Sequence, residues 1–326
     1  MTKVIKSIKP THYLDTLGLS RIIKIDKARL AQYSTAFRKH KTLSKLTKII
    51  DATSDKKQRI KYWSTYHCRN VVLQDGNNFS SSLCRKRWCS CCCRIKTAEL
   101  TNGYKKPLLE LGQLYFVTLT RPNVKGRQLN SEIRKLQSAF TRIKNNMQSK
   151  NYSIKIQGMR KLEVTYNEKS DTYHPHFHII MSDYLATQTL LELWHKQFPT
   201  ANSKAQDVRA IPLGDEQSFI ELFKYATKET TKDGEDYSGQ VLNTIYSSLN
   251  GIKLYQKYGT FKKVKDPIEV KEHQTTFEHI PTNQDIFVYD KEQKDWIGEK
   301  GNLLVDTEYI TQTLKINQEY KLTKLN

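Results

Sequence analysis

Three histidines at alternate positions are the residues best suited to metal chemistry in this chain. They are His174, His176 and His178 in the stretch YHPHFHII. Alternate residues of a β-strand point to the same side, so the imidazoles would share one face while Phe177 faces the core. Pro175 has no backbone N–H to donate, which predicts an edge position or the start of a strand. Histidines two residues apart on a strand form a compact two-nitrogen metal site.

A carboxylate is the expected third ligand of this site. Glu163 lies in the preceding alternating segment KLEVTYN, and a short polar turn separates that segment from the histidines. Two imidazoles and one carboxylate, with further positions open, suit Mg²⁺ or Mn²⁺ holding a phosphate, or a transition metal. His176 and His178 are the favoured pair, and His174, next to the proline, is expected to lie outside the pair and to support the site. The alternative is a set of solvent-facing histidines on an edge strand.

A candidate nucleophile follows in the stretch ELFKYATK. On a helix, Glu221 and Tyr225 are four residues apart and share one face, and Lys228 follows one turn later. A tyrosine oxygen can attack a phosphodiester and hold a covalent 5′-phosphate, if the developing charge is neutralised. Lys228 would orient the tyrosinate or the phosphate, and Glu221 would activate water in a later step. Alone, this stretch also fits an ordinary amphipathic helix; beside a metal-binding strand it favours catalysis.

The cysteines form a second candidate metal site. All six fall within one short segment, which favours metal ligation over a disulfide framework in a cytoplasmic chain. A C-x2-C spacing supplies two ligands from one tight turn, and two earlier cysteines can complete a tetrahedral zinc site. The expected ligands of this structural zinc are Cys68, Cys84, Cys89 and Cys92. The choice among Cys91, Cys92 and Cys93 stays open, His67 is a substitute for Cys68, and spare reduced thiols are the alternative.

Alternating strands and helices after the cysteine segment would position these side chains. Alternating and β-branched stretches predict strands, and apolar residues three and four apart predict helices. The expected strands span residues 114–122, 158–167, 174–181 and 205–213, and the expected helices span residues 131–149, 186–198 and 215–229. The middle two strands would pair as an antiparallel hairpin. This order predicts an α/β fold of the α+β type, with a mostly antiparallel central sheet flanked by helices.

Other segments carry weaker signals. Residues 12–62 are expected to be mainly helical, with apolar positions at Leu30, Tyr33 and Phe37, and residues 74–82 form a hairpin-like loop. The helix over residues 131–149 would begin with Ser131 as its N-cap. Its buried stripe is expected to be Ile133, Leu136, Phe140 and Ile143.

The charge distribution points to a polyanionic partner. The formal net charge is +21, and residues 1–110 hold 24 Lys/Arg against 7 Asp/Glu, which leaves a net charge of only +4 for the remaining residues. Such an asymmetric basic excess indicates nucleic acid more often than a solvated surface. The chain has no apolar run long enough to span a membrane and no apolar signal core, so the cytoplasm is the expected compartment and no membrane partner is expected.

The combination of motifs resembles the rolling-circle replication initiators of small bacterial plasmids, members of the HUH endonuclease superfamily. The stretch FVTLT at residues 116–120 is similar to the first family motif, and HPHFH, with the pair His176 and His178, is similar to the second. Tyr225, four residues after Glu221, is similar to the third. The stretch CRKRWCSCC resembles the family's cysteine segment, except for a serine where proline is usual. A block over residues 246–266 resembles the segment after the tyrosine helix, with departures at Asn250 and Ile252.

The resemblance implies a metal-dependent DNA nickase and strand transferase with the HUH endonuclease fold. Tyr225 would attack the scissile phosphate held by a divalent metal on the glutamate–histidine set. The products would be a 5′-phosphotyrosine and a free 3′-OH that primes synthesis. Glu221 would activate water for the terminating cleavage. A single tyrosine is expected, because Tyr237 lies in a loop rich in glycine and aspartate.

The resemblance also implies partners and a domain plan. The DNA partner would be a plasmid double-strand origin with a single-stranded or hairpin nick site, and the host partners would be a helicase, a polymerase and a single-strand binding protein. A dimer on DNA is compatible with this function. The expected domains are a basic helical region that binds origin DNA, a zinc-binding segment, a catalytic domain and an extension of unknown role, over residues 1–62, 63–110, 111–266 and 267–326.

Two alternatives remain at this point. A transposase or conjugative relaxase of the same superfamily would keep the chemistry, although relaxases usually place the tyrosine before the histidines. A non-catalytic DNA-binding regulator with a structural zinc would explain the charge and the cysteines. It would not explain why Glu163, the histidine pair and Tyr225 occur together.

Overall fold

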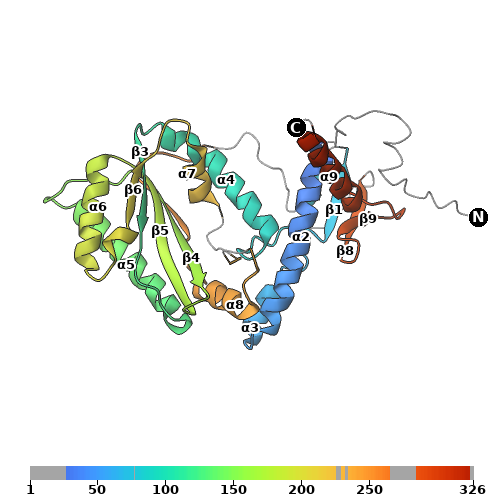
Figure 1. Cartoon of the computed structure of the whole chain (residues 1–326), viewed down its shortest axis with the longest axis horizontal. Coiled ribbons are helices and arrows are strands. Elements are labelled where there is room, and N and C mark those ends of the chain that lie inside the picture. The colour runs from blue at the N-terminus through green and yellow to red at the C-terminus, as the bar shows by residue number, and fades with distance from the viewer. Residues whose placement is uncertain (1–26, 77, 225–228, 232–233, 265–283, 324–326) are drawn as a thin grey trace, which may run out of the picture. The chain divides into compact units, whose positions relative to one another are not determined.

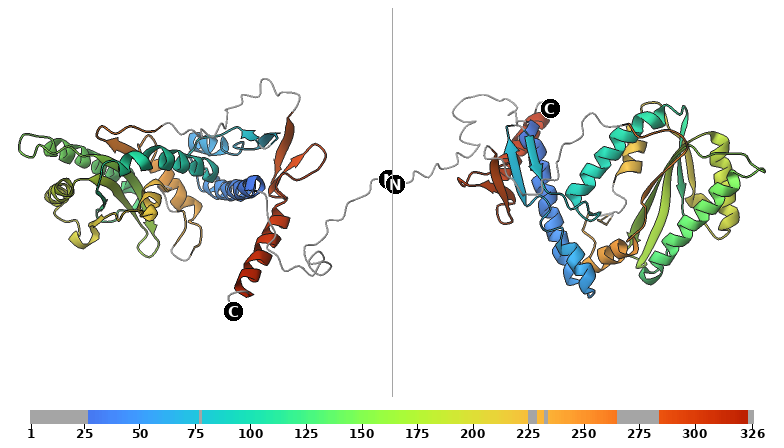
Figure 2. Two further views of the ribbon diagram at one scale, coloured as in Figure 1. Left: turned by 90° about the horizontal axis from the view of Figure 1, so that it is seen from above. Right: turned by 180° about the vertical axis from the view of Figure 1, so that it is seen from behind.

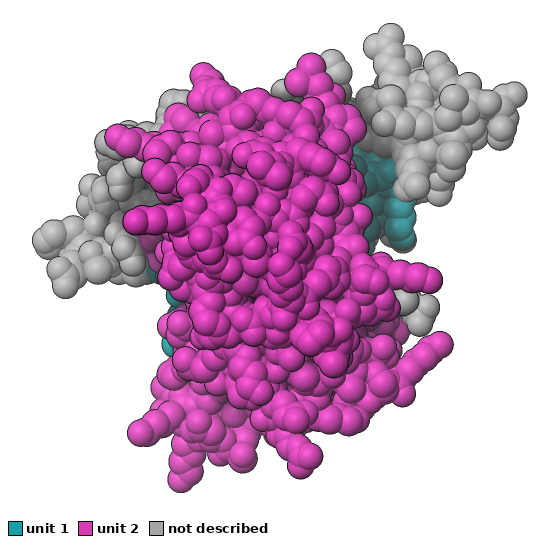
Figure 3. Space-filling model, turned by 90° about the vertical axis from the view of Figure 1, so that its left-hand side faces the viewer, with its two compact units in different colours: residues 1–44, 64–84, 271–326 teal, residues 45–63, 85–270 magenta. Residues whose placement is uncertain are grey.

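The structure is a computed structural model that describes residues 27–76, 78–224, 229–231, 234–264 and 284–323. Its contacts divide the chain into two units, which Figure 3 shows in different colours. Unit 1 comprises residues 1–44, 64–84 and 271–326, and unit 2 comprises residues 45–63 and 85–270. The described helices include none that is both long and apolar enough to cross a membrane.

The five-stranded sheet of unit 2 confirms the expected antiparallel arrangement. Its strand order is β6-β3-β5-β4-β7, and every neighbouring pair is antiparallel. The strands are β3 (Leu114–Leu119), β4 (Gly158–Asn167), β5 (Thr172–Ser182), β6 (Asp207–Ala210) and β7 (Tyr255–Tyr258). The predicted hairpin of β4 and β5 is present, and β7, which was not predicted, forms an edge of the sheet.

Helices cover both faces of this sheet (Figure 1 and Figure 2). Helices α5 (Leu129–Met147) and α6 (Tyr184–Gln197) pack on one face, where the ring of Phe177 contacts Phe140 of α5 and Trp194 of α6. Helices α4 (Ser90–Leu109) and α7 (Glu216–Phe223) pack on the other face, in a core that includes Phe116 and Ile180. Helices α3 (Lys56–Trp63) and α8 (Gly239–Ser248) also belong to this unit.

Helix α5 has the predicted buried stripe but a different start. Its expected apolar residues Ile133, Leu136, Phe140 and Ile143 are all buried. The helix begins at Leu129 after a short 3-10 turn (Gly126–Gln128), so Gln128 is the N-cap residue. The prediction of Ser131 as N-cap is therefore wrong. Its hydroxyl donates instead to the Gln128 carbonyl within the first turn.

Helix α7 ends earlier than predicted. It stops at Phe223, and Lys224 has an extended backbone with φ −61° and ψ 171°. The Tyr255 hydroxyl donates to the carbonyls of Phe223 (3.3 Å) and Lys224 (2.7 Å), so it satisfies carbonyl groups that a helix end leaves without intrahelical partners. The expectation of one continuous helix over residues 215–229 is wrong at this point.

Pro175 lies inside β5 rather than at the start of a strand. Strand β5 begins at Thr172 and lies between β3 and β4, which differs from the expected edge or terminal position. The ladder between β3 and β5 starts only at Phe177, opposite Leu119. Pro175 is therefore tolerated because it precedes that ladder and needs no partner from β3.

Unit 1 contains a four-stranded antiparallel sheet of order β2-β1-β8-β9. Strands β1 (Val71–Asp75) and β2 (Asn78–Ser81) form the expected hairpin, and β8 (Asp285–Asp290) pairs with β1. Strand β9 (Asp295–Gly298) and helix α9 (Thr307–Thr323) follow. The indole N–H of Trp296 donates to the Arg69 carbonyl (2.8 Å). The C-terminal strands therefore fold together with the segment between Cys68 and Cys84.

The first described helix, α2 (Lys27–Asp51), buries a different stripe from the one the sequence suggested. Leu30 and Phe37 are exposed, whereas Ala36 and Leu43 are buried. Tyr33 is half-buried, and its hydroxyl lies 3.0 Å from the Thr311 hydroxyl of α9. The helical prediction for residues 12–62 holds from Lys27 onward, and the earlier residues lie outside the described part of the chain.

Candidate active site

The β4–β5 hairpin places the glutamate and the histidines on one face of the sheet. Glu163 is directly opposite His176 in the ladder, and Lys161 is opposite His178. Potential ligand atoms of Glu163, His176 and His178 all lie within 4.8 Å of one another. Phe177, between the two histidines, is fully buried on the opposite face. The alternation read from the sequence therefore produces the expected cluster.

The two histidine rings point their outer nitrogens at each other. His176 Nε2 lies 3.1 Å from His178 Nε2, and His178 Nε2 lies 3.5 Å from Glu163 Oε2. The side chains of Glu163 and His178 are 2% and 12% exposed. This is a convergent set of two imidazoles and one carboxylate, mostly shielded from water.

Hydrogen bonds fix how the histidines present these nitrogens. His176 Nδ1 lies 3.0 Å from the His174 carbonyl, which can only accept, so Nδ1 carries the proton and Nε2 keeps a lone pair. Burial lowers the pKa of His176 to about 4, although Glu163 partly opposes this shift, so the imidazole is neutral at pH 7. His178 Nδ1 contacts the Thr118 hydroxyl (3.3 Å) on β3. Such partners orient the ring of a metal-binding histidine.

His174 packs against the His176 ring, with the ring centroids 4.9 Å apart, but is not one of the clustered ligands. Its Nδ1 lies 2.7 Å from the Asn123 side-chain oxygen, and burial, followed by the influence of His176, lowers its pKa to about 4. The ligand group contains the other two histidines and not this one. Its backbone carbonyl, however, holds the ring of His176.

A buried lysine, which the sequence reasoning missed, lies beside the cluster. Lys161 is fully buried, and its Nζ donates to Glu163 Oε2 (2.5 Å) and to the backbone carbonyl of Glu221 (2.9 Å). Burial lowers the pKa of Lys161, and the Glu163 carboxylate partly offsets that effect. For Glu163, burial opposes ionisation, but Lys161 and His176 outweigh it and lower the pKa below its ordinary value. In the sequence, the only indication that Lys161 belongs to the site is its position two residues before Glu163.

Glu221 lies at the edge of the same cluster. Its Oε1 is 3.8 Å from His178 Nε2, and its Oε2 accepts a hydrogen bond from Lys224, a residue that the sequence reasoning did not single out. Tyr225 and Lys228 lie outside the described residues. Tyr237, the other tyrosine weighed in the sequence analysis, is 3% exposed, and its hydroxyl donates to the Tyr166 carbonyl (3.2 Å). Tyr237 is therefore a packed side chain of the core.

The donor set fits a divalent cation. Two imidazole nitrogens and a carboxylate are a common ligand combination for first-row transition metals, and carboxylate oxygen also suits Mg²⁺ and Mn²⁺. Nearby, the Glu221 carboxylate adds a further oxygen within reach of the outer part of the site. The buried surroundings would exclude most competing water ligands while one side stays open at His178.

The predicted cysteine set also comes together. The sulfur atoms of Cys68, Cys84, Cys89 and Cys92 lie within 4.8 Å of one another. The Cys84 N–H donates to the Cys68 sulfur (3.4 Å), and the Arg85 N–H donates to the Cys92 sulfur (3.3 Å). The Cys93 thiol donates to the Arg87 carbonyl (3.0 Å). Among the three adjacent cysteines, Cys92 is therefore the one that joins the group, and the group contains Cys68 rather than His67.

The sequence of this chain matches one family of known proteins. The Rep_1 family, described as replication protein, matches residues 77–300. Protein rep of Staphylococcus aureus is 27% identical over 175 residues, which are 49% of this chain and 75% of that protein. Protein rep of Streptococcus pneumoniae serotype 2 (strain D39 / NCTC 7466) is 27% identical over 225 residues, or 62% and 69%. Protein rep of Lentilactobacillus hilgardii is 22% identical over 279 residues, or 76% and 82%.

No solved structure matches the chain. The family match nevertheless covers more than half of the sequence, including the cysteines from Cys84 onward, the histidine strand and the segment that contains Glu221. It agrees with the resemblance to rolling-circle plasmid replication initiators. The chain belongs to the Rep_1 family of replication proteins.

Proposed function

We propose that this protein initiates rolling-circle replication of a plasmid by nicking one strand of its double-strand origin. The observation that supports this best is the cluster of Glu163, His176 and His178 on one face of the sheet. Glu221 lies at its edge, and Tyr225 follows Glu221 by four residues. A transposase or relaxase would share the chemistry, but the family match favours a replication protein.

In this proposal, Tyr225 is the nucleophile. Its phenolic oxygen forms a bond to the scissile phosphorus, and the bond from phosphorus to the 3′-oxygen breaks. The tyrosine gives up its phenolic proton in this step, the 5′-phosphate remains attached to the tyrosine, and the 3′-oxygen takes up a proton to become the 3′-OH that primes synthesis. Glu163, His176 and His178 would hold Mg²⁺ or Mn²⁺, which when bound would neutralise charge on the phosphate. Lys228 would orient the tyrosine, and Glu221 would activate water in the terminating cleavage.

The test is formation of a covalent protein–DNA adduct. Wild-type protein with Mn²⁺ and labelled single-stranded origin DNA is expected to form an adduct that survives denaturing electrophoresis. Tyr225→Phe removes the attacking oxygen and is expected to abolish the adduct completely. Tyr237→Phe is the matched control, because the buried Tyr237 contacts the Tyr166 carbonyl, and it is expected to keep the adduct. An adduct with Tyr225→Phe would overturn the nucleophile assignment.

Several parts of the replication machinery follow from the same proposal. The basic residues of the region 1–62 would contact origin DNA through its phosphates. The catalytic domain would span residues 111–266, after the cysteine segment 63–110. The residues after 266 would act together with that segment, because β8 pairs with β1. A host polymerase would extend the 3′-OH, together with a host helicase and a single-strand binding protein.

We also propose that the four clustered cysteines hold a structural Zn²⁺. Four sulfur ligands are typical of closed, structural zinc sites, and the binding energy of such sites contributes directly to folding. Cys92→Ser is expected to lose the zinc and to lower Tm by about 10 °C. This fall corresponds to a loss of about 2.5–5 kcal/mol in the free energy of unfolding, since each kcal/mol changes Tm by about 2–4 °C in a protein of this size. Cys91→Ser, an adjacent buried position outside the group, is the control.

Metal analysis and thermal unfolding are the measurements for this zinc site. Purified wild type and Cys91→Ser are expected to carry one zinc per chain. A variant Cys92→Ser that keeps its zinc would show that another residue completes the site.

A further inference from the structure

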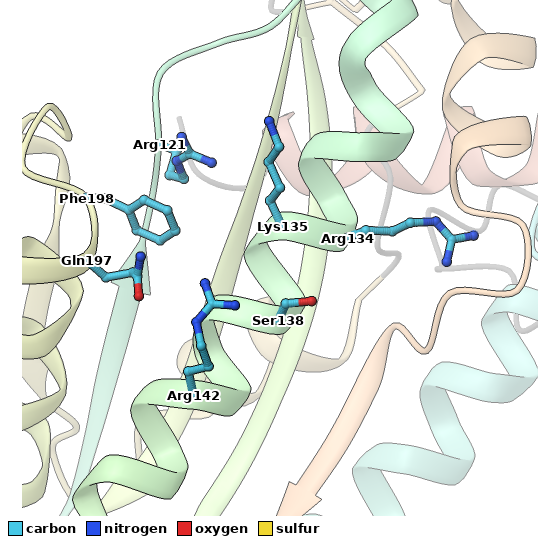
Figure 4. A pocket seen from close by; sticks show the side chains of 7 residues that line it. All are labelled: Arg121, Arg134, Lys135, Ser138, Arg142, Gln197 and Phe198. Atoms are coloured by element: carbon cyan, nitrogen blue, oxygen red, sulfur yellow. The ribbon is translucent and has the colours of Figure 1, made fainter.

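A basic cavity lies along helix α5, away from the cluster of Glu163, His176 and His178. We call it the α5 groove. It has a volume of about 460 Å³, and its lining includes four cations, Arg121, Arg134, Lys135 and Arg142, with Gln197 and Phe198 at the end of α6. Figure 4 shows Lys135 and Arg142 on the flank of α5 that faces Arg121 and Phe198, whereas Arg134 extends from the other flank.

The groove carries an excess of positive charge. Arg121 pairs with Glu132, a buried residue that is the sole acid on α5. Lys135 and Arg142 are exposed, and within the described part of the chain no carboxylate forms an ion pair with either. They are seven residues apart on one helix, which separates them by about 10 Å along its axis. Lys135 and Arg142 are therefore two solvent-exposed cations that line the α5 groove.

The groove belongs to the opposite face of the sheet from the proposed active site. Side chains alternate along β5, so Phe177 points away from the face that carries His176 and His178. Phe177 packs against Phe140 of α5 and Trp194 of α6. The helices that build the groove therefore cover the face without the metal ligands, and the groove serves a different contact from the scissile phosphate.

The chemistry of the groove favours a DNA backbone over unpaired bases. Sites for single strands stack bases on exposed aromatic rings. Phe198, an aromatic ring in the lining, is already engaged, because the Arg121 guanidinium lies 4.2 Å from its ring centroid and Trp194 packs against it at 4.7 Å. What remains is a row of cations with polar neighbours, and about 10 Å corresponds to about three phosphate steps of one strand.

We propose that the α5 groove binds the phosphate backbone of double-stranded DNA. This inference rests on the proposed function, and it adds a second DNA contact on the sheet face opposite the nicking site. The groove would hold duplex next to the origin while the other face acts on the extruded single strand. Its contacts would be independent of base sequence, so they would position the duplex and leave sequence readout to other residues.

The test compares two double variants in a salt titration of duplex binding. Lys135→Gln with Arg142→Gln removes the two exposed groove cations. Lys204→Gln with Lys262→Gln removes two exposed lysines outside the groove and serves as the matched control. With labelled origin duplex lacking the extruded hairpin, the slope of log K against log salt is expected to fall in magnitude by about 1.8 for the groove variant, because each phosphate contact contributes about 0.9.

The other outcomes each decide the question. The control variant is expected to keep the wild-type slope, and both variants are expected to nick a short single-stranded substrate within about twofold of wild type, since nicking uses the other face. An equal fall of the salt slope in both variants would mean that duplex DNA responds to the overall positive charge of the surface. That result would overturn the groove as a binding site. Weaker binding of the single strand alone would reassign the groove to unpaired DNA. Duplex binding requires no cleavage, so failure of Tyr225 to act as nucleophile would leave this measurement unaffected.

Discussion

Replacing His176 with alanine is expected to lower the rate of metal-dependent nicking by about a thousandfold, or about 4 kcal/mol of transition-state stabilisation. His176 lies opposite Glu163 in the ladder, and its Nε2 is 3.1 Å from the matching nitrogen of His178. Without it, the cluster keeps one imidazole and one carboxylate. Two ligands are too few to hold a divalent cation firmly beside the phosphate.

His174→Ala is the matched control, with the same residue type changed two positions earlier on the same face. The contact that orients His176 comes from the backbone carbonyl of His174, and alanine keeps that carbonyl. The substitution removes the ring contact with Asn123 and the packing of the His174 ring against the His176 ring, whose centroids are 4.9 Å apart. The expected loss of nicking rate is therefore at most about tenfold, the lower end of the range for residues that support a ligand.

The measurement is the single-turnover rate on a labelled oligonucleotide at saturating Mn²⁺, with Mn²⁺ affinity determined separately by titration. His176→Ala is expected to lose both Mn²⁺ affinity and rate, and His174→Ala is expected to keep the affinity. Equal losses in the two variants would show that all three histidines act as ligands. That result would reject the assignment of His176 and His178 as the only two histidine ligands.

The site could be anticipated from the sequence where local alternation determines it. The pattern of β4 and β5 predicts which side chains share a face, and the short turn between them brings Glu163 opposite His176. The stripe of α5 was predictable for the same reason, because its buried residues recur at helical spacing. Features that depend only on the period of one element are visible in the order of residues.

Features that depend on distant contacts were not visible. Strand β8 pairs with β1 from the far end of the chain, and no local pattern encodes that pairing. Helix α7 ends at Phe223, where the hydroxyl of Tyr255, on strand β7, contacts the carbonyls of Phe223 and Lys224. Lys161 in an alternating strand resembles a solvent-facing residue, and only the packing of α7 over β4 buries it against the Glu221 carbonyl. Each of these three features depends on a tertiary contact.

Lys161→Met is expected to destabilise the metal-free protein and to tighten its binding of Mn²⁺. The lysine is fully buried and donates to Glu163 Oε2 at 2.5 Å. Its loss leaves a buried carboxylate without its cation, which costs about 3–5 kcal/mol. The same loss removes a positive charge that competes with a divalent cation for that carboxylate. We expect the Kd for Mn²⁺ to fall about tenfold, equivalent to about 1.4 kcal/mol.

Arg160→Met separates this electrostatic effect from a general loss of packing. Arg160 is the adjacent residue on β4, is equally buried, and lies on the other face with its guanidinium 4.1 Å from the ring centroid of Phe177. Its replacement is expected to lower Tm without changing the Kd for Mn²⁺. In thermal unfolding, saturating Mn²⁺ should therefore raise Tm more for Lys161→Met than for wild type or Arg160→Met, because a ligand stabilises in proportion to the logarithm of its affinity. Weaker Mn²⁺ binding by Lys161→Met would mean that the lysine chiefly holds Glu163 in place, so that its charge favours the site rather than opposing the metal.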